Sequence, residues 1–487
     1  MSKILHVFSL ILIFTLPLFA QGLDTAWVRT YNGPGNLDDQ ARDLAGDHNG
    51  NVYVTGSSYG SGSDYDYATI KYYPNGDTAW VRRWNGPGNG SDQASALVLD
   101  DRGNVYVTGS CNADSLGADF TTIKYYPDGE TAWVRTYNGP DSNSDIAVAL
   151  KVDVSGNVYV SGYSFYDSTN ADYLTVKYDS SGIQLWTRRY NGTGNLPDLV
   201  RAMSLDSFGN IYVTGTSYDW TTFKDYATIK YYPNGDTAWV RRYNGPGNTY
   251  DQALDIIVDD SEYVYVTGTA GTIKYDSNGV EKWIGAWGGE KIAVDYSGNI
   301  YVTGRAALKC ITIKYLPDGD TAWVRTYSGP DGFEDGAYDL ALDDSGNAYV
   351  TGYSFSGGYE NCLTIKYNST GDTGWIARYD GPAHQGAVAL AMALDNSGNI
   401  YIAGEIGSGT DYDYVTIKYV QFFRGDANGD SKVMVSDVIY LINYLFKSGS
   451  KPDPFQSGDA NCDGKVTVAD VIYLVNYLFK GGPSPVC

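Results

Sequence analysis

Two short segments near the C-terminus carry side chains that can bind a hard metal ion. Each has oxygen-bearing side chains at its first, third, fifth and twelfth positions: Asp426, Asn428, Asp430 and Asp437, then Asp459, Asn461, Asp463 and Asp470. The backbone carbonyls of Lys432 and Lys465 stand at the seventh position. Calcium prefers oxygen ligands in a flexible cage, and alternate residues of a tight loop can supply them. The duplicated spacing predicts two bound calcium ions; the alternative is a pair of degenerate loops that bind none.

An apolar helix is predicted after each loop, over residues 437–447 and 470–480. Apolar residues at helical spacing form one stripe on each helix: Val438, Leu441, Ile442 and Leu445, then Val471, Leu474, Val475 and Leu478. So short a segment can bury only a small core. We therefore expect metal binding to complete its folding.

The duplicated loop and helix resemble type I dockerin repeats over residues 425–480. The resemblance implies a cohesin-like protein domain as partner, and attachment of the chain to a scaffold or cell surface. Partner-reading positions of that family precede the last loop Asp, and here they are Val435, Ser436, Val468 and Ala469. They depart from the hydroxyl pair common in the family, which leaves cohesin recognition less firmly indicated than calcium binding. Ser431 replaces the Gly that makes the sharp turn in the first loop, and we expect it to weaken that site.

Tyrosines one turn apart also repeat on the two predicted helices. Tyr440 and Tyr444 on the first are matched by Tyr473 and Tyr477 on the second. They have two interpretations: a duplicated partner-binding face, or rings that cover the small core.

The chain before these two loops contains eight repeats, in which three strand motifs recur in a fixed order. A Trp-initiated strand recurs at Trp27, Trp80, Trp133, Trp186, Trp239, Trp283, Trp323 and Trp375. A Tyr-Val-Thr-Gly-like strand and an Ile-Lys-Tyr-like strand also occur eight times each, for example at Tyr53 and Ile70. These strands alternate apolar and polar residues, and a run of small residues precedes each Tyr strand, as suits an inner strand. The pattern predicts an all-β, eight-bladed β-propeller of four-stranded blades.

Ring closure is expected because the N-terminal Trp strand, residues 26–33, can complete the last blade, which ends near Tyr419. An open solenoid is the alternative, but it would leave strand edges bare. Over about residues 24–420 the repeats resemble the SBBP β-propeller repeat family, in motifs such as residues 104–109 and 122–125. That family is named for seven blades, whereas this sequence contains eight repeats. A Gly four residues before most of the Trp residues resembles a tryptophan-docking motif, and we interpret it as packing between blades.

A ligand surface is expected where two kinds of loop share one face of the propeller. They include residues 137–141, 57–66 and 217–225, which are rich in Tyr, Ser, Gly and Asp. Such loops can bind a glycan or a protein, or can simply be polar turns. The fifth and sixth repeats are shortened after Val266 and Val302, which predicts a notch in this face.

Catalysis finds little support in the residue pattern. The three histidines, His6, His48 and His384, suggest no nucleophile–base pair. Most Asp residues repeat in turn positions, which favours a structural role. We therefore predict a protein that is not an enzyme, with a carboxylate pair acting on polysaccharide as the alternative. Clustered carboxylates with perturbed pKa values would favour the enzyme; a flat, tyrosine-rich face would favour binding.

Charge and cysteine content limit the partners and the compartment. The net charge of −23 disfavours nucleic acid and anionic lipid. Residues 1–20 read as a signal peptide, with no further apolar span for membrane insertion. Cys462 and Cys487 can pair in an oxidising compartment. Cys310 and Cys362 occupy one repeat position, which favours burial, and Cys111 has no evident partner.

The sequence thus predicts a signal peptide over residues 1–20, a β-propeller over 21–420 and a dockerin-like calcium-binding domain over 421–487. We expect a secreted, monomeric, non-catalytic adaptor. Its propeller would bind a glycan or protein, and its calcium-dependent module would tether it to a cohesin-type scaffold or cell surface. Two alternatives remain: a tethered glycoside hydrolase or lyase, and a structural surface or matrix protein.

Overall fold

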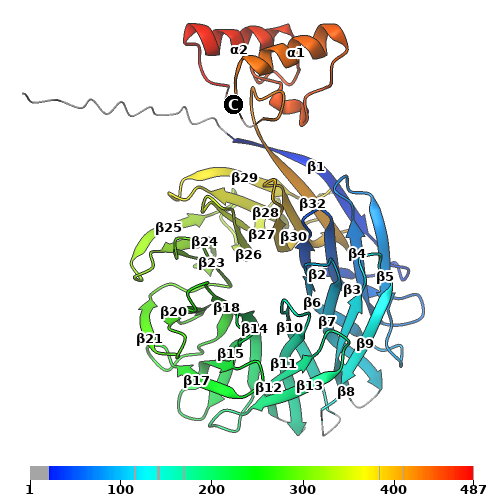
Figure 1. The fold of residues 1–487 in the computed structure, drawn as a ribbon, viewed down its shortest axis with the longest axis vertical. Helices are drawn as coiled ribbons and strands as arrows, with labels where there is room; N and C mark the ends of the chain where they lie inside the picture. The colour runs from blue at the N-terminus through cyan, green and yellow to red at the C-terminus, as the bar shows by residue number, and fades with distance from the viewer. Residues whose placement is uncertain are drawn as a thin grey trace, which may run out of the picture. The chain divides into compact units, whose positions relative to one another are not determined.

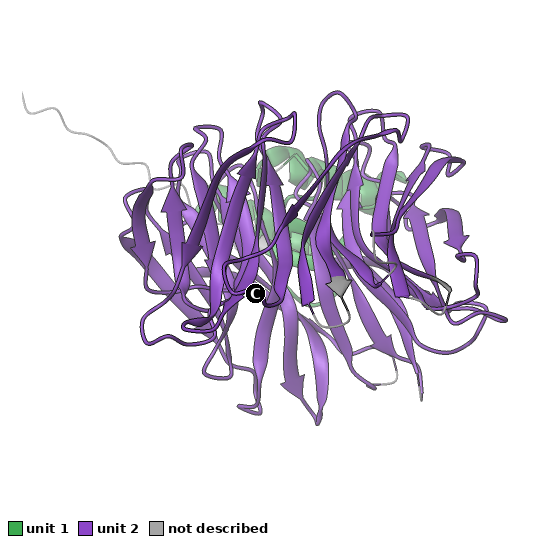
Figure 2. Ribbon diagram, turned by 90° about the horizontal axis from the view of Figure 1, so that it is seen from below, with its two compact units in different colours: residues 1–24, 420–487 green, residues 25–419 purple. Residues whose placement is uncertain are grey.

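The computed structural model describes residues 21–114, 117–139, 143–167, 170–382, 384–409, 411–430 and 432–485. The chain forms two compact units, Thr25–Tyr419 and a smaller one made of Met1–Asp24 with Val420–Cys487 (Figure 2). None of the helices in these ranges has the length and hydropathy needed to cross a membrane. The predicted signal peptide lies outside the described residues.

The larger unit is a ring of eight four-stranded antiparallel sheets within the described ranges (Figure 1). Blades one and two are β2 (Asp39–Gly46), β3 (Val52–Tyr59), β4 (Tyr65–Tyr72), β5 (Thr78–Trp84), and β6 (Asp92–Leu99), β7 (Val105–Asp114), β8 (Gly117–Tyr125), β9 (Thr131–Tyr137). Blades three and four are β10 (Asp145–Val152), β11 (Val158–Asp167), β12 (Asn170–Tyr178), β13 (Gln184–Tyr190), and β14 (Asp198–Leu205), β15 (Ile211–Asp219), β16 (Phe223–Tyr231), β17 (Thr237–Tyr243).

The second half of the ring repeats this order with two shortened blades. Blades five and six are β18 (Ala253–Val258), β19 (Val264–Gly268), β20 (Gly271–Tyr275), β21 (Glu281–Gly285), and β22 (Lys291–Val294), β23 (Ile300–Ala306), β24 (Lys309–Tyr315), β25 (Thr321–Tyr327). Blades seven and eight are β26 (Asp335–Leu342), β27 (Ala348–Ser356), β28 (Tyr359–Tyr367), β29 (Thr373–Tyr379), and β30 (Ala387–Leu394), β31 (Ile400–Gly407), β32 (Tyr412–Phe423) with β1 (Gln21–Tyr31). Because β1 pairs with β32 as the outer strand of blade eight, the prediction of ring closure is confirmed.

Neighbouring blades are joined by the repeated tryptophans. The indole N–H of Trp133 donates a hydrogen bond of 3.2 Å to the carbonyl of Ser180 in the next blade. A Cβ at Gly182 would lie 2.9 Å from the same indole, so only glycine fits the turn on which the ring packs. Arg135 adds a hydrogen bond of 2.6 Å to the Gly182 carbonyl. These contacts support the packing interpretation of the Gly–Trp motif.

The smaller unit contains α1 (Val435–Lys447), the short 3-10 helix η1 (Phe455–Ser457) and α2 (Val468–Lys480). Both α-helices begin two residues earlier than predicted, because the last loop Asp lies inside the first turn. Asp437 accepts a hydrogen bond of 2.7 Å from the backbone N–H of Met434, and Asp470 accepts the equivalent bond from Thr467. The helices pack around the fully buried Leu441 and Leu474.

Candidate calcium sites and binding surfaces

The first loop gathers its predicted ligands around backbone N–H groups. The N–H of Asp430 donates hydrogen bonds of 3.0 Å to oxygens of both Asp426 and Asn428, so these two oxygens lie close together. Asp437 accepts a bond of 3.1 Å from the N–H of Asn428 and is fully buried. Burial raises the pKa of Asp437 to about 6, and the carboxylates of Asp426 and Asp430 add to the rise.

The second loop repeats this geometry. The N–H of Asp463 donates bonds of 3.1 Å to Asp459 and 3.0 Å to Asn461, and buried Asp470 accepts a bond of 3.1 Å from the N–H of Asn461. Asp459 also lies 3.3 Å from the guanidinium of Arg424. Hydrogen bonds therefore link the predicted side-chain ligands of each loop, and Ser431 of the first loop lies outside the described residues.

The donor chemistry fits calcium better than a softer ion. Over the described ranges, no three Asp, Glu, His or Cys side chains are arranged to hold a metal ion by themselves. Each loop would therefore use an Asn side chain and the carbonyl of Lys432 or Lys465 together with its carboxylates, a mixed oxygen set that calcium accepts. A cation would also offset the repulsion among the carboxylates around Asp437.

The helices α1 and α2 expose matching apolar side chains, which the sequence analysis missed. Ile439 and Phe446 on α1 correspond to Ile472 and Phe479 on α2, and the two Phe side chains are 66% and 64% exposed. The predicted partner residues Val435, Ser436, Val468 and Ala469 are exposed in the first turns of the same helices. With the two Ile and two Phe residues, we name them the twin apolar faces. A seven-residue spacing repeated on both helices is the signal that could have found them.

The four helix tyrosines are less exposed than the twin apolar faces. Tyr440, Tyr444, Tyr473 and Tyr477 are half-buried against the core of the smaller unit. The hydroxyl of Tyr440 donates a hydrogen bond of 3.2 Å to the Lys451 carbonyl, and Tyr473 donates a matching bond to Ser484. These contacts favour the interpretation that the rings cover the core.

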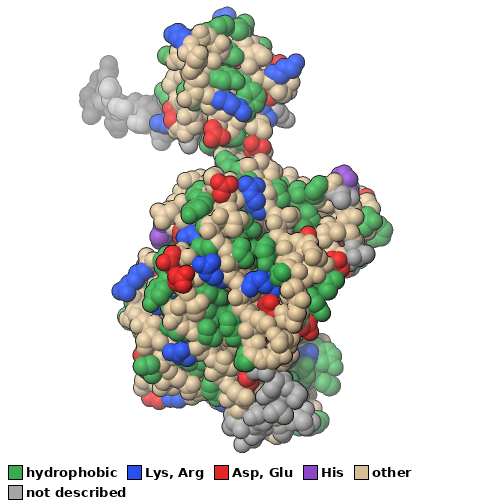
Figure 3. Space-filling model, turned by 90° about the vertical axis from the view of Figure 1, so that its right-hand side faces the viewer, with side chains coloured by type: hydrophobic (Ala, Val, Ile, Leu, Met, Phe, Trp, Pro, Cys, Tyr) green, Lys and Arg blue, Asp and Glu red, His purple; other side chains and the backbone are tan. Residues whose placement is uncertain are grey.

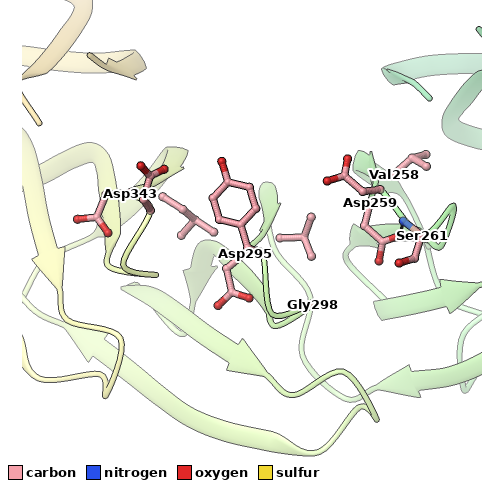
Figure 4. A pocket seen from close by; sticks show the side chains of 11 residues that line it. Val258, Asp259, Ser261, Asp295, Gly298 and Asp343 are labelled. Atoms are coloured by element: carbon pink, nitrogen blue, oxygen red, sulfur yellow. Dashed lines mark hydrogen bonds between the residues drawn. The ribbon is translucent and has the colours of Figure 1, made fainter. Parts of the chain in front are cut away.

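A pocket of about 320 Å³ lies at the turns that join the first and second strands of blades five to seven (Figure 4). Asp259, Asp295 and Asp343 line it. Each accepts hydrogen bonds from its own turn; Asp295, for example, accepts bonds of 2.9 Å from the N–H groups of Ser297 and Asn299. These repeated carboxylates are therefore structural, as the sequence pattern indicates.

The centre of the ring holds a second cavity, of about 330 Å³, lined by charged side chains. Asp43, Asp255, Asp339, Lys151 and Lys291 face it from the inner strands. Asp43 accepts a hydrogen bond of 2.7 Å from the N–H of Leu97 in the next blade, and Asp339 accepts a bond of the same length from Met392. Burial raises the pKa of Asp43 to about 6, whereas Asp255 raises the pKa of Lys291.

Three glutamates, just before β22, in β28 and in β31, have perturbed carboxyl groups. Burial raises the pKa values of Glu290, Glu360 and Glu405 above the ordinary range. The negative charges of all three contribute to the raised pKa of the Tyr338 hydroxyl, whose largest cause is burial. Raised pKa values of carboxyl groups are a feature that enzymes use, but many structural carboxylates share it.

The loop face also carries exposed aromatic rings, among them those around the β15–β16 hairpin of residues 217–225. Trp220, Phe223 and Tyr250 are all more than half exposed. The equivalent loop of blade one, within residues 57–66, has Gly60 and Gly62 at its tip, and residues 140–141 of the third predicted loop lie outside the described residues. Acidic, basic and hydrophobic side chains intermingle on the side of the propeller shown in Figure 3.

The cysteines follow their expected environments where the structure describes them. Cys111, Cys310 and Cys362 are buried free thiols. Cys462 is in a disulfide bond, and Cys487, its predicted partner, lies outside the described residues.

Comparisons with known proteins agree with this architecture. The dockerin type I domain family matches residues 424–479, and the beta-propeller repeat family matches residues 26–62 and 289–306. Dockerin domains generally bind calcium, have cohesin partners and occur in extracellular proteins. No curated protein matches the chain in sequence.

Solved structures share the fold at low identity. Sqt1 from Chaetomium thermophilum is 10% identical with a TM-score of 0.53, over 82% of this chain and 99% of that one. A puromycin hydrolase is 12% identical with a TM-score of 0.48; the match covers 78% of this chain but only 61% of the hydrolase. A polysaccharide lyase, Uly1, is 10% identical with a TM-score of 0.43, over 77% of this chain and 89% of the lyase. The likeness to Sqt1, at 10% identity, shows the fold alone. The chain is a dockerin-bearing β-propeller protein, in which propeller repeats precede a type I dockerin domain.

Proposed function

We propose that this protein is a secreted adaptor whose propeller binds a glycan or protein ligand and whose dockerin domain tethers it, with two calcium ions, to a cohesin-type scaffold. The observation that carries the proposal is the pair of equivalent loops, each with a buried carboxylate at its twelfth position. Calcium binding there would hold α1 and α2 in position. The exposed helix faces would then be available to a partner.

The twin apolar faces support docking through these helices. Soluble proteins seldom expose a contiguous apolar patch without a binding role. Here Ile439 and Phe446 on one helix and Ile472 and Phe479 on the other remain exposed after the small core has formed. Because each helix carries the same face, either one offers a docking surface. The two compact units, Thr25–Tyr419 and the dockerin-containing one, fit separate ligand and tether roles.

Capture by a panel of purified cohesin-domain proteins, with calcium and with a chelator, tests the tether. We expect capture in calcium only, and loss of capture when Ile439→Asp and Ile472→Asp are combined. A Tyr473→Ala, Tyr477→Ala variant tests the other predicted face. Capture that is insensitive to calcium would contradict the proposal, as would full capture of the double Ile variant.

A polysaccharide-degrading enzyme is the second candidate function. It is favoured by Glu290, Glu360 and Glu405, because burial raises the pKa values of their carboxyl groups and a raised pKa suits a general acid. Release of reducing ends or unsaturated products from polysaccharides would reveal such an activity. It should then be lost in Glu360→Gln and kept in Glu130→Gln, a change in an exposed turn.

A further inference from the structure

The β15–β16 hairpin of blade four and the connection into blade five present three aromatic side chains to solvent. Trp220 at its tip is 77% exposed, and Tyr250, in the connection into blade five, is 63% exposed. The ring of Phe223 lies 5.9 Å from that of Tyr250, centre to centre. We name Trp220, Phe223 and Tyr250 the aromatic platform. Large aromatic groups left in water at neighbouring positions are a feature of binding sites.

Contacts from both flanks hold the rings of the platform in place. The indole N–H of Trp220 donates a hydrogen bond of 3.1 Å to the carbonyl of Gly194. On the other flank, the ammonium group of Lys224 lies 5.2 Å from the centre of the Tyr250 ring, and the two residues form a backbone bridge. A ligand would therefore meet surfaces that are already ordered, which lowers the entropic cost of binding.

The backbone at Phe223 is strained. Its φ is 66°, in the left-handed region that bulky residues rarely adopt. The equivalent hairpin of blade seven turns through Gly357 and Gly358, with φ values of 65° and 89°. A phenylalanine thus stands in a left-handed hairpin position of the kind that blade seven fills with glycine. Such strain is found most often at functional sites.

Polar groups beside the rings suit a ligand rich in hydroxyls. Asp219 accepts hydrogen bonds of 2.7 Å from the Thr221 hydroxyl and 2.9 Å from the Thr193 hydroxyl, and these bonds lower the pKa of Asp219 to about 2. The carboxylate is therefore ionised and can accept further bonds from sugar hydroxyls. Aromatic rings bind the C–H faces of sugars while such groups fix their orientation.

The negative charge of this surface favours a neutral ligand over an acidic one. Lys224 is the basic residue of this hairpin, and its ammonium group lies against the Tyr218 and Tyr250 rings, 5.0 Å and 5.2 Å from their centres. The adjacent Asp219 is negative, and the whole chain carries a net charge of −23. An acidic polysaccharide would be repelled from this surface.

The shortened fifth blade leaves room for a chain-like ligand. The β15–β16 hairpin pairs out to Asp219 and Phe223, whereas β19–β20 in blade five closes between Gly268 and Gly271. The predicted notch therefore lies next to the platform, on the side of Tyr250. A polymer could extend from Trp220 across Tyr250 without meeting a second long hairpin.

We propose that the aromatic platform binds a neutral polysaccharide, with Trp220 and Tyr250 as stacking surfaces and Asp219 as a hydroxyl acceptor. This inference rests on the proposed ligand-binding role of the propeller and names its site and ligand class.

Affinity electrophoresis of the full chain tests the proposal, in gels that contain xylan, glucomannan or hydroxyethylcellulose, with polygalacturonate as the acidic comparison. We expect retardation by at least one neutral polysaccharide, and affinity at least about tenfold weaker in Trp220→Ala and in Tyr250→Ala. Phe208→Ala is the matched control, because Phe208 is 67% exposed in the turn at the other end of strand β15. Its retardation should equal that of the wild type.

Three results would overturn the inference: no retardation by any of the neutral polysaccharides, binding of polygalacturonate alone, or unchanged binding in both platform variants. Cohesin capture, measured on the same preparations, reports the tether separately. If both variants still bind the glycan, the glycan-binding site lies elsewhere on the propeller, and the proposed ligand-binding role of the propeller is unaffected. If cohesin capture is absent while glycan binding is intact, the proposed tethering role is contradicted and the proposed glycan site is retained.

Discussion

The carboxylate of Asp437 accepts a hydrogen bond of 3.1 Å from the backbone N–H of Asn428, so the last residue of the loop holds a candidate ligand from its first half. Asp470 and Asn461 form the same bond, of the same length, in the second loop. The two loops therefore share this geometry, and we expect each to bind one ion.

Calorimetric titration of the full chain should show two calcium ions bound, and one in either Asp426→Ala or Asp459→Ala. Each substitution removes the carboxylate at the first position of one loop, which calcium needs as a hard ligand. Asp101→Ala, in an exposed propeller turn, is the control and should keep both ions. Loss of both ions in a single variant would show that the loops are not independent.

Single changes in the twin apolar faces should weaken cohesin capture less than the pair. Ile439→Asp or Ile472→Asp leaves the other exposed face intact, so we expect affinity to fall less than about tenfold. The double variant has no intact face and should fall by about a hundredfold or more. Surface plasmon resonance measures both, with calcium stoichiometry as the control for folding. A full loss in one single variant would assign docking to one helix.

Ionisation of Asp43 should lower the stability of the propeller as pH rises. Its pKa of about 6 in the folded protein exceeds the ordinary value of 3.8, despite the hydrogen bond from Leu97 and the nearby Lys291 and Lys151; Asp339 adds to the rise. The folded state then binds this proton more tightly than the unfolded chain does. Stability is lost between about pH 4 and pH 6 and stays constant above.

Asp43→Asn cannot ionise, and it keeps an oxygen that can accept the bond from Leu97. Between pH 4 and pH 7 the free energy of unfolding should therefore shift in favour of the variant by about 2 kcal/mol. Denaturant unfolding of both proteins across this range measures the shift. Parallel pH profiles would show that the Asp43 carboxylate titrates as it does in the unfolded chain.

Trp133→Ala should destabilise the propeller by about 3–5 kcal/mol, because the buried indole fills the space between two blades and bonds to Ser180. Trp220→Ala removes the same side chain from an exposed position and should change the free energy of unfolding by less than about 0.5 kcal/mol. Thermal unfolding compares the two directly. Equal effects would argue against the packing role of the repeated tryptophans.

Phe223→Asn should weaken polysaccharide binding without loss of stability. Asn tolerates the left-handed backbone that Phe223 adopts, so the variant relieves about 1 kcal/mol of strain. It also removes a ring of the platform. Thermal unfolding and affinity electrophoresis on one preparation check both effects. A large loss of stability would mean that the ring packs as core and would count against a binding role for it.

The sequence by itself determined the number of blades, the closure of the ring and the ligand spacing of both loops. These features are local or repeated: strand alternation, the recurring tryptophans and the positions one, three, five and twelve can be read without knowledge of contacts. Even the completion of blade eight by residues 26–33 follows from the order of the repeats. The predicted helix starts are two residues late, because the capping carboxylates of Asp437 and Asp470 lie inside the first helical turn rather than before it.

Only the tertiary structure decided which side of each helix faces solvent. Tyr440 and Ile439 are adjacent on α1, and the repeated spacing marks both without showing which of them packs inward. Packing around Leu441 and Leu474 leaves Tyr440 half-buried and Ile439 exposed. The same holds for the charges at the ring centre and for the aromatic platform. Trp220 reaches Gly194 on one flank of the hairpin and Lys224 pairs with Tyr250 on the other, and no local sequence pattern encodes these contacts between separate connections.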